Sequence, residues 1–293
     1  MKERNDSIKE IDEGMELLID AKDLGYRELN LKVRNFLNCS GRGGFGSYGD
    51  DSGNGVNCEY SSDNRRREVT IKNALGHRYI GDGLKGDSRI NVYGTPGNDL
   101  GAFMDGPTLE IFGNGQDGIG NTMNSGKIIV HGDAGDILGY SMRGGEIYIE
   151  KSIGFRGGIH MKSYREKVPV IVIGGSAGDF LGEYMAGGII ILLGLHKRQR
   201  AGLPFAGKPD IIGNYTGTGM HGGKIYIRGN IEDYKLGKEV RKSVAGREDL
   251  DLLDRYIDTY CNLFNLNRKK FSDNSFLKLI PYSNRPYGKL YAY

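Results

Sequence analysis

A single phrase, repeated seven times between residues 80 and 229, constrains the fold of this chain more than any other feature. In each copy a glycine is followed three residues later by a long apolar residue, in most copies by further glycines, and then by an apolar-x-apolar run. The clearest copy runs from Gly139 to Ile149. Successive copies begin 20, 19, 19, 19, 24 and 35 residues apart. Such a period is typical of solenoids, whose units bury their apolar sides only by stacking.

The repeat places one glycine and one long apolar residue at fixed positions, and we predict that both columns form a structural ladder. The column glycines are Gly81, Gly101, Gly120, Gly139, Gly158, Gly182 and Gly217. Three residues after them stand Leu84, Met104, Met123, Met142, Met161, Met185 and Met220. Unbranched methionines fill irregular interior gaps, and this interpretation is preferred over a soft-metal site. Glycine is needed where a turn requires positive φ or where backbone segments approach closely.

The apolar alternations in the copies predict short stacked strands, such as Leu109-x-Ile111 and Ile147-x-Ile149, and residues 69–71 are a plausible first strand. The predicted fold class is an all-β solenoid. We expect a right-handed parallel β-helix of about seven coils over residues 66–232, with helical N- and C-terminal caps.

Five copies carry Asn or Asp three residues before the column glycine. These residues are Asn98, Asp117, Asp136, Asp179 and Asn214. Such side chains commonly accept hydrogen bonds from the backbone of their own turn, so we interpret them as turn formers stacked along one edge. A mixture of amides and carboxylates favours this role over an acid/base or Ca²⁺ site.

The segments that flank the repeat differ from it in composition. Residues 1–37 have helical spacing and are predicted to form an N-terminal helical cap, because the first coil exposes an unpaired edge. Residues 38–65 are rich in Gly, Ser and Asp and are predicted to be a flexible loop. In residues 233–293 we expect a helix over 249–264 that caps the last coil, followed by an extended tail.

An insertion over residues 195–211 is basic and contains an aromatic residue. Its possible partner-docking residues are Lys197, Arg198, Arg200, Phe205 and Lys208. A solvated surface loop is an equally good interpretation of this insertion. The strings 41–46 and 202–209 imitate nucleotide-binding loops, but they lack the strand-to-helix context that binds phosphate.

Composition excludes several classes of protein. The chain has 293 residues, 38% hydrophobic content and a net charge of only +3, which is unlike a nucleic-acid-binding polycation. It contains no apolar run long enough to cross a membrane, and its charged N-terminus is unlike a signal peptide, so we expect a cytoplasmic protein. Cys39, Cys58 and Cys261 are too few and too widely spaced for a zinc or iron–sulfur site.

The repeated Gly-x-x-Met-x-Gly-Gly phrases, together with residues 94–101 and 217–223, resemble the C-terminal glycine-repeat (GXGXG) β-helix domain of the glutamate synthase large subunit, in its stand-alone subunit form. The resemblance implies a scaffold subunit of a split complex that transfers the amide nitrogen of glutamine to 2-oxoglutarate or a related acceptor. It implies two partners, a class II glutamine amidotransferase chain and an FMN/iron–sulfur synthase chain. FMN and the iron–sulfur clusters are expected on those partners.

The catalytic parts of glutamate synthases are not expected on this chain. Lys2 stands where a glutaminase exposes its N-terminal cysteine, and no β/α-barrel pattern occurs. We therefore predict no catalytic, cofactor-binding or metal-binding residues and no activity of the chain alone.

Two other functions stay open at this point. The same repeat class occurs in the β-helical subunit of formylmethanofuran dehydrogenase. A self-contained polysaccharide lyase or hydrolase would have to use the aspartates near the column glycines, such as Asp99 and Asp117. His131, His160 and His221 share no repeat position, so we interpret them as structural or surface residues.

Overall fold

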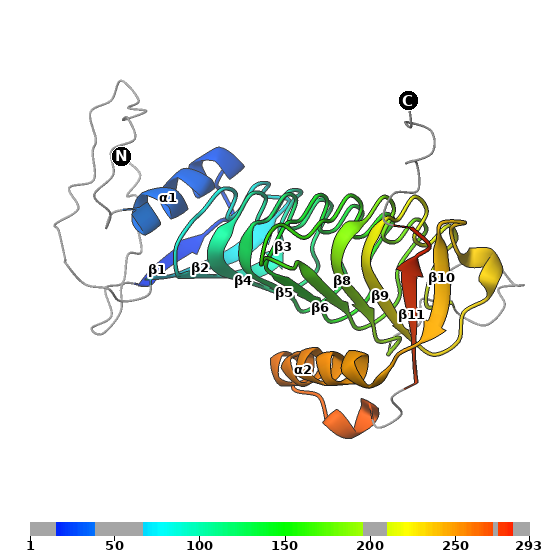
Figure 1. The fold of residues 1–293 in the computed structure, drawn as a ribbon. Helices are drawn as coiled ribbons and strands as arrows, with labels where there is room; N and C mark the ends of the chain where they lie inside the picture. Colours follow the sequence, from blue (N-terminus) through cyan, green and yellow to red (C-terminus); the bar gives the residue numbers. More distant parts are fainter. Residues whose placement is uncertain (1–15, 39–66, 196–209, 272–274, 284–293) are drawn as a thin grey trace, which may run out of the picture.

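The computed structural model describes residues 16–38, 67–195, 210–271 and 275–283. These residues form an elongated solenoid along which the strands follow one another (Figure 1). The strands form one 11-stranded sheet in the order β1-β2-β3-β4-β5-β6-β7-β8-β9-β11-β10. Consecutive strands from β1 to β9 pair in parallel. The predicted all-β parallel solenoid is confirmed, and its number of turns is close to the seven expected.

The strands are β1 (Glu16–Asp20), β2 (Arg67–Leu75), β3 (Ser88–Thr95), β4 (Asp105–Phe112), β5 (Ser125–Val130), β6 (Glu146–Ile149), β7 (Val170–Ile173), β8 (Ala186–Leu192), β9 (Gly222–Arg228), β10 (Val240–Val244) and β11 (Phe276–Pro281). The helices are α1 (Tyr26–Asn38) and α2 (Arg247–Leu263), with short 3₁₀ turns η1 (Asp233–Lys235) and η2 (Arg268–Phe271).

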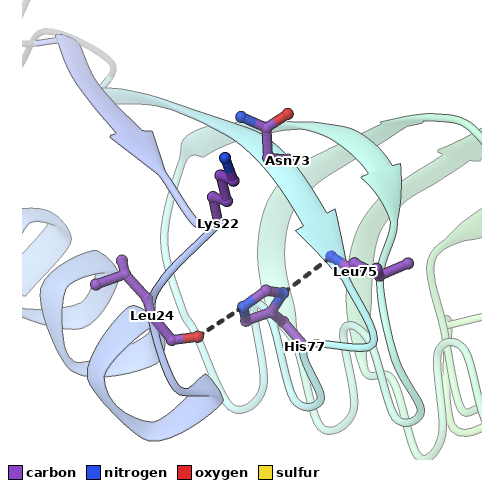
Figure 2. Close-up of a pocket in the computed structure, with 5 residues that line it drawn as sticks. All are labelled: Lys22, Leu24, Asn73, Leu75 and His77. Atoms are coloured by element: carbon purple, nitrogen blue, oxygen red, sulfur yellow. Dashed lines mark hydrogen bonds between the residues drawn. The ribbon is translucent and has the colours of Figure 1, made fainter.

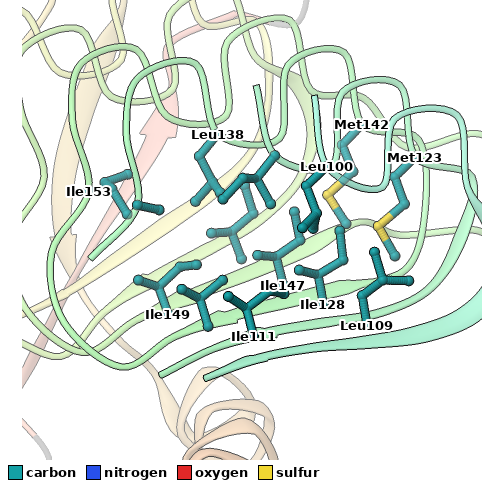
Figure 3. Close-up of a cluster of buried hydrophobic side chains, with 14 of the residues drawn as sticks. Leu100, Leu109, Ile111, Met123, Ile128, Leu138, Met142, Ile147, Ile149 and Ile153 are labelled. Atoms are coloured by element: carbon teal, nitrogen blue, oxygen red, sulfur yellow. The ribbon is translucent and has the colours of Figure 1, made fainter. Parts of the chain in front are cut away.

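The interior of the solenoid is filled by strand residues and by the methionine column (Figure 3). Parallel pairing stacks equivalent residues of successive coils, so that Leu109 lies beside Ile128 and Ile128 beside Ile147. All six column methionines are 0% exposed, and Leu84 is 3% exposed. Burial of each such side chain contributes ~2 kcal/mol, which explains why the repeat keeps long apolar residues there.

Each coil turns at a corner in which three alternate residues adopt positive φ. The three positions are the column glycine and the residues two before and two after it. In one coil φ is 51° at Ile137, 66° at Gly139 and 52° at Ser141. The same alternation recurs in all seven copies. The corner is therefore one conformation repeated coil after coil.

This alternation directs the corner N–H groups toward both neighbouring coils. The N–H of Ile137 donates to the carbonyl of Phe155 in the next coil at 2.8 Å. The N–H of Gly139 donates in the opposite direction, to the carbonyl of Ile119 at 2.8 Å. The corners thus stack as a hydrogen-bonded ladder that satisfies buried backbone groups.

Only the middle left-handed residue has to be glycine, because its Cα faces the interior. A Cβ on Gly139 would lie 2.6 Å from Cδ1 of Ile171, inside the van der Waals distance. The flanking left-handed positions face outward and accept side chains such as those of Ile137 and Ser141.

The Asn and Asp column lines one edge of the stack, but its hydrogen bonds run between coils. Oδ1 of Asp117 accepts the N–H of Asp136 at 2.8 Å, and Oδ1 of Asp136 accepts the N–H of Phe155 at 2.7 Å. The expectation that these side chains bond to their own turn is wrong for this pair. The stacked neighbouring coil places a backbone N–H within reach of each of these side chains, and that N–H is not there until the coils have stacked.

The prediction of helix over residues 16–20 is also wrong, because this segment is strand β1. It pairs in parallel with β2 and buries Leu17 and Ile19. A short apolar run is compatible with both helical and strand periodicity. This segment forms a strand because β2 offers it an unpaired edge. The helical part of the expected cap is α1, which buries Leu29 and Val33.

Helix α2 lies along the outer face of the sheet and does not cap the last coil as predicted (Figure 1). Its Leu253 and Ile257 belong to a second apolar cluster with Tyr148, Val172 and Ile191 of the strands. The last parallel strand is covered by β11, which pairs antiparallel with β9, and by β10, which pairs antiparallel with β11. Residues 284–293 of the expected tail lie outside the described residues.

Asp249 fastens α2 to the end of the sheet. Its carboxylate accepts hydrogen bonds from the hydroxyl of Tyr226 at 2.6 Å, from Nζ of Lys278 at 2.5 Å and from the N–H of Gly246 at 2.9 Å. Burial alone would raise the pKa of Asp249, but these hydrogen bonds, with the Lys278 charge, hold its pKa well below the usual range. The contact with Gly246 also satisfies a helix N-terminal N–H group.

The corner geometry predicts different costs for two glycine substitutions. Gly139→Ala combines left-handed backbone strain with a clash and should lower stability by ~3 kcal/mol. Gly83→Ala has a similar φ of 62° but no atom within 4 Å of the added Cβ, so it should cost only ~1 kcal/mol. Urea unfolding of both variants measures the difference in the free energy of unfolding. Equal losses of stability would show that the clash between the added Cβ and Ile171 does not matter.

The lowered pKa of Asp249 predicts a pH-dependent contribution to stability. This contribution is fully present above the unfolded-state pKa of ~3.9 and is lost as pH falls through the lower folded-state pKa. Asp249→Asn should therefore cost ~2 kcal/mol at neutral pH, and the gap to the wild type should narrow below about pH 4. Thermal unfolding across this range tests the expectation. A gap that stays constant down to pH 2 would contradict it.

Candidate functional site

The outer face of strands β2 to β5 carries a connected polar network. Glu110 is 9% exposed and accepts hydrogen bonds from Arg89 and from Nε2 of His131, the latter at 2.8 Å. Nε of Arg89 also donates to Oδ1 of Asn91 at 3.1 Å, and Asn91 donates to Glu68. Both carboxylate oxygens of Glu110 are occupied, so this residue links β3 and β4 to the residue that follows β5, and it is poorly placed to exchange a proton with a ligand.

An aromatic stack runs beside this network toward α2. Tyr93 stacks on Phe112 with ring centroids 4.6 Å apart, and Phe112 stacks on His131 at 4.8 Å. Phe264, which follows α2, closes the stack edge-on against His131 at 5.1 Å. The ring of His131 is thereby held by contacts with both Phe112 and Phe264.

The left-handed corners present a second group of outward-facing side chains. We define the corner cluster as the residues around the column glycines 158, 182 and 217 that include Arg156, His160, Phe180, Glu183, Tyr184 and Tyr215. Two parallel stacks organise it. Phe180 stacks on Tyr215 at 5.0 Å, and His160 stacks on Tyr184 at 5.4 Å. His160, Tyr184 and Tyr215 are exposed, so these rings lie on the surface of the solenoid.

Glu183 lies within the corner cluster and is only 8% exposed. Nε of Arg156 lies 3.3 Å from Oε2 of Glu183, and the guanidinium carbon of Arg156 stands 5.3 Å from the ring centre of Phe180. Among the described residues, no group donates a hydrogen bond to Oε2 of Glu183. The cluster therefore contains a nearly buried carboxylate that its own ion pair satisfies incompletely.

A shallow pocket of about 470 Å³ lies between the N-terminal segment and β2 (Figure 2). His77 in this pocket uses both ring nitrogens, since Nδ1 accepts the N–H of Leu75 at 3.0 Å and Nε2 lies 2.9 Å from the carbonyl of Leu24. Nε2 must carry the proton, because the carbonyl only accepts. His77 thus fastens the segment before α1 to the solenoid and has no nitrogen left for a ligand.

Comparison with known proteins agrees with this geometry. Residues 51–281 match the family described as the GXGXG motif. The chain belongs to the GXGXG family, the family of the glutamate synthase C-terminal domain. An uncharacterized protein of Methanocaldococcus jannaschii is 43% identical over 281 residues, which cover 94% of this chain and 97% of that protein.

The spacing of the GXGXG motif equals the spacing of the three left-handed corner positions. In this chain the middle position is glycine in every copy, whereas the outer two hold other residues in most copies. Gly118 and Gly120 occupy two of the three positions in one copy, and Gly217 and Gly219 do so in another. The glycine spacing of the GXGXG family thus has a direct conformational meaning at the corners.

The predicted docking residues and the aspartates near the column glycines have different outcomes. The docking residues Lys197, Arg198, Arg200, Phe205 and Lys208 lie outside the described residues, as do the glycine-rich strings 41–46 and 202–209. A lyase would need Asp99, Asp117, Asp136 and Asp179. Asp117, Asp136 and Asp179 each accept a backbone N–H of the next coil, and Oδ1 of Asp99 accepts a hydrogen bond from the side-chain amide of Asn121 at 3.2 Å. These carboxylates are therefore structural parts of the GXGXG corner.

In the part of the chain that the structure describes, no three His, Cys, Asp or Glu side chains are grouped to hold a metal ion. Burial raises the pKa of the Cys261 thiol, which disfavours the reactive thiolate. No helix among the described residues has the length and apolar character to cross a bilayer.

Sequence reasoning missed both the Glu110 network and the corner cluster. Glu110 stands in an alternating strand at an outward position, which normally indicates a solvated residue. Glu183 follows a column glycine directly, where the other copies have residues as different as Ala102 and Tyr140. An acidic residue between aromatic neighbours, Phe180 and Tyr184, was the available signal.

The polar network predicts unequal effects of two charge removals. Glu110→Gln removes the nearly buried carboxylate that pairs with both Arg89 and His131 and should lower stability by ~2 kcal/mol. Glu68→Gln, at a side chain that is 43% exposed, should cost at most ~0.5 kcal/mol. Thermal unfolding of both variants measures this. Equal losses would show that Glu110 is not the centre of the network.

Proposed function

We propose that this GXGXG chain is a scaffold subunit of a glutamate-synthase-type complex. It would hold a class II glutamine amidotransferase chain beside an FMN/iron–sulfur synthase chain, so that nitrogen released from glutamine reaches 2-oxoglutarate or a related acceptor. The flavin and the clusters belong to the synthase chain and supply its redox chemistry. The cytoplasm is the proposed site of this assembly.

The family match over residues 51–281 is the observation that carries this proposal. The solenoid geometry supports it, because a rigid stack of coils presents long, regular surfaces to other chains. Its described outer face offers paired charges and exposed aromatic rings. Side chains of these kinds suit recognition of another protein better than attack on a substrate.

Co-expression with the amidotransferase and synthase chains of the same source tests the proposal. We expect the three chains to co-elute on size exclusion, and glutamine-dependent glutamate formation to fall at least tenfold when this chain is omitted. Recovery of this chain with molybdopterin-containing subunits, or activity of the chain alone on a sugar polymer, would contradict the proposal.

A further inference from the structure

The residues that directly follow the column methionines stack from coil to coil on the surface of the solenoid. The N–H of Arg143 donates to the carbonyl of Met123 at 2.8 Å. In the next coil the N–H of Lys162 donates to the carbonyl of Met142 at 3.0 Å. Arg143 and Lys162 therefore occupy the same position on adjacent coils, ~4.8 Å apart along the stack. Both residues are exposed.

These two stacked cations are not neutralised by the protein around them. On the neighbouring strands β5 and β6, stacked charges have opposite signs, since Nζ of Lys127 lies 3.2 Å from Oε2 of Glu146. Within the described part of the chain, by contrast, no carboxylate forms an ion pair with Arg143 or Lys162. Like charges on neighbouring strands are destabilising. Two unpaired cations at this spacing therefore point to a negatively charged group that binds there.

A short hairpin lies beside these cations and adds an aromatic ring. Two backbone hydrogen bonds of 3.0 Å between Tyr164 and Lys167 close it, and Nζ of Lys167 lies 3.6 Å from Oδ1 of Asp105. Tyr164 is 53% exposed, and the guanidinium carbon of Arg165 stands 5.2 Å from the centre of its ring. A cation and an exposed tyrosine are typical of protein interfaces. We define the basic edge as Arg143, Lys162, Tyr164 and Arg165.

We propose that the basic edge is the docking surface for an acidic helix of a partner chain, whose carboxylates pair with Arg143 and Lys162 and whose apolar side chain packs on Tyr164. The inference rests on the proposed function, since the partner is one of the two chains of that complex. Charge complementarity supports an acidic occupant. Helical residues four apart lie ~5–6 Å from each other, which matches the ~4.8 Å spacing of the coils.

Other occupants fit the basic edge less well. A second copy bound about a two-fold axis would bring the same cations together, and each copy would supply only one carboxylate of the hairpin, Glu166. A nucleic acid carries negative charge along its whole length and is bound in long basic grooves. The cationic part of this column spans only two coils, because the equivalent residues on either side are Asn124 and Ala186.

The test measures the affinity of each co-expressed partner chain for the full-length protein and its variants. Arg143→Gln combined with Lys162→Gln should weaken binding of one partner at least tenfold, and Tyr164→Ser at least fivefold. Arg78→Gln combined with Lys151→Gln is the matched control, because it removes one arginine and one lysine from exposed positions elsewhere. It should change the affinity less than twofold. The affinity of the wild type should also fall more steeply with salt than that of the Arg143 and Lys162 variant.

Melting of the isolated chains separates docking from folding. Because the substitutions at Arg143 and Lys162 remove a repulsion, the double variant should have an unchanged or higher Tm while its complex is weakened. Wild-type affinity of this variant for both partners, or an equal loss in the control, would overturn the inference while leaving the proposed function intact. Wild-type protein that binds neither partner would overturn both. A wild-type dimer, or wild-type binding to single-stranded DNA, that the double variant loses would identify a different occupant and overturn the inference.

Discussion

The alternating left-handed corner is the constraint on which the rest of this structure depends. Three residues of positive φ per coil turn the chain and point successive N–H groups toward the coils on either side. The middle residue faces a wall of isoleucine and leucine side chains and has no room for a Cβ. Once Gly139 and its equivalents meet this condition, parallel strands and buried methionines stack at one spacing along the whole solenoid.

The outer face of the same sheet is divided into two parts with different chemistry. Strands β2 to β4 carry charged and polar residues that pair with one another, and Glu110 joins them to His131, which follows β5. Strands β6 to β9 carry apolar residues such as Tyr148 and Ile191, which α2 covers. Asp249 fixes that helix through β9 and β11. Helix α2 packs on the outer face of the sheet because that face is apolar and burying it is favourable, whereas the last parallel strand, β9, is already paired with β11.

The repeat made the core predictable, but it was a poor guide to functional surfaces. Methionine burial followed from recurrence, because every copy must occupy the same environment. Glu183 and Arg156 occupy positions where the other copies differ, so the periodic pattern carries no information about them. Their chemistry emerges only when three successive corners bring a carboxylate, a guanidinium and two pairs of stacked rings together.

The sequence by itself determined the period, the glycine and methionine columns, the parallel strands and the membership of the GXGXG family. These features are local and repeated, so each copy confirms the others. Only the tertiary structure decided that residues 16–20 form the first strand, that α2 covers a flank, and that Asp117 bonds to the next coil. The physical reason is that each of these outcomes depends on an unpaired edge, an apolar face or a free N–H group that exists only after other coils have stacked.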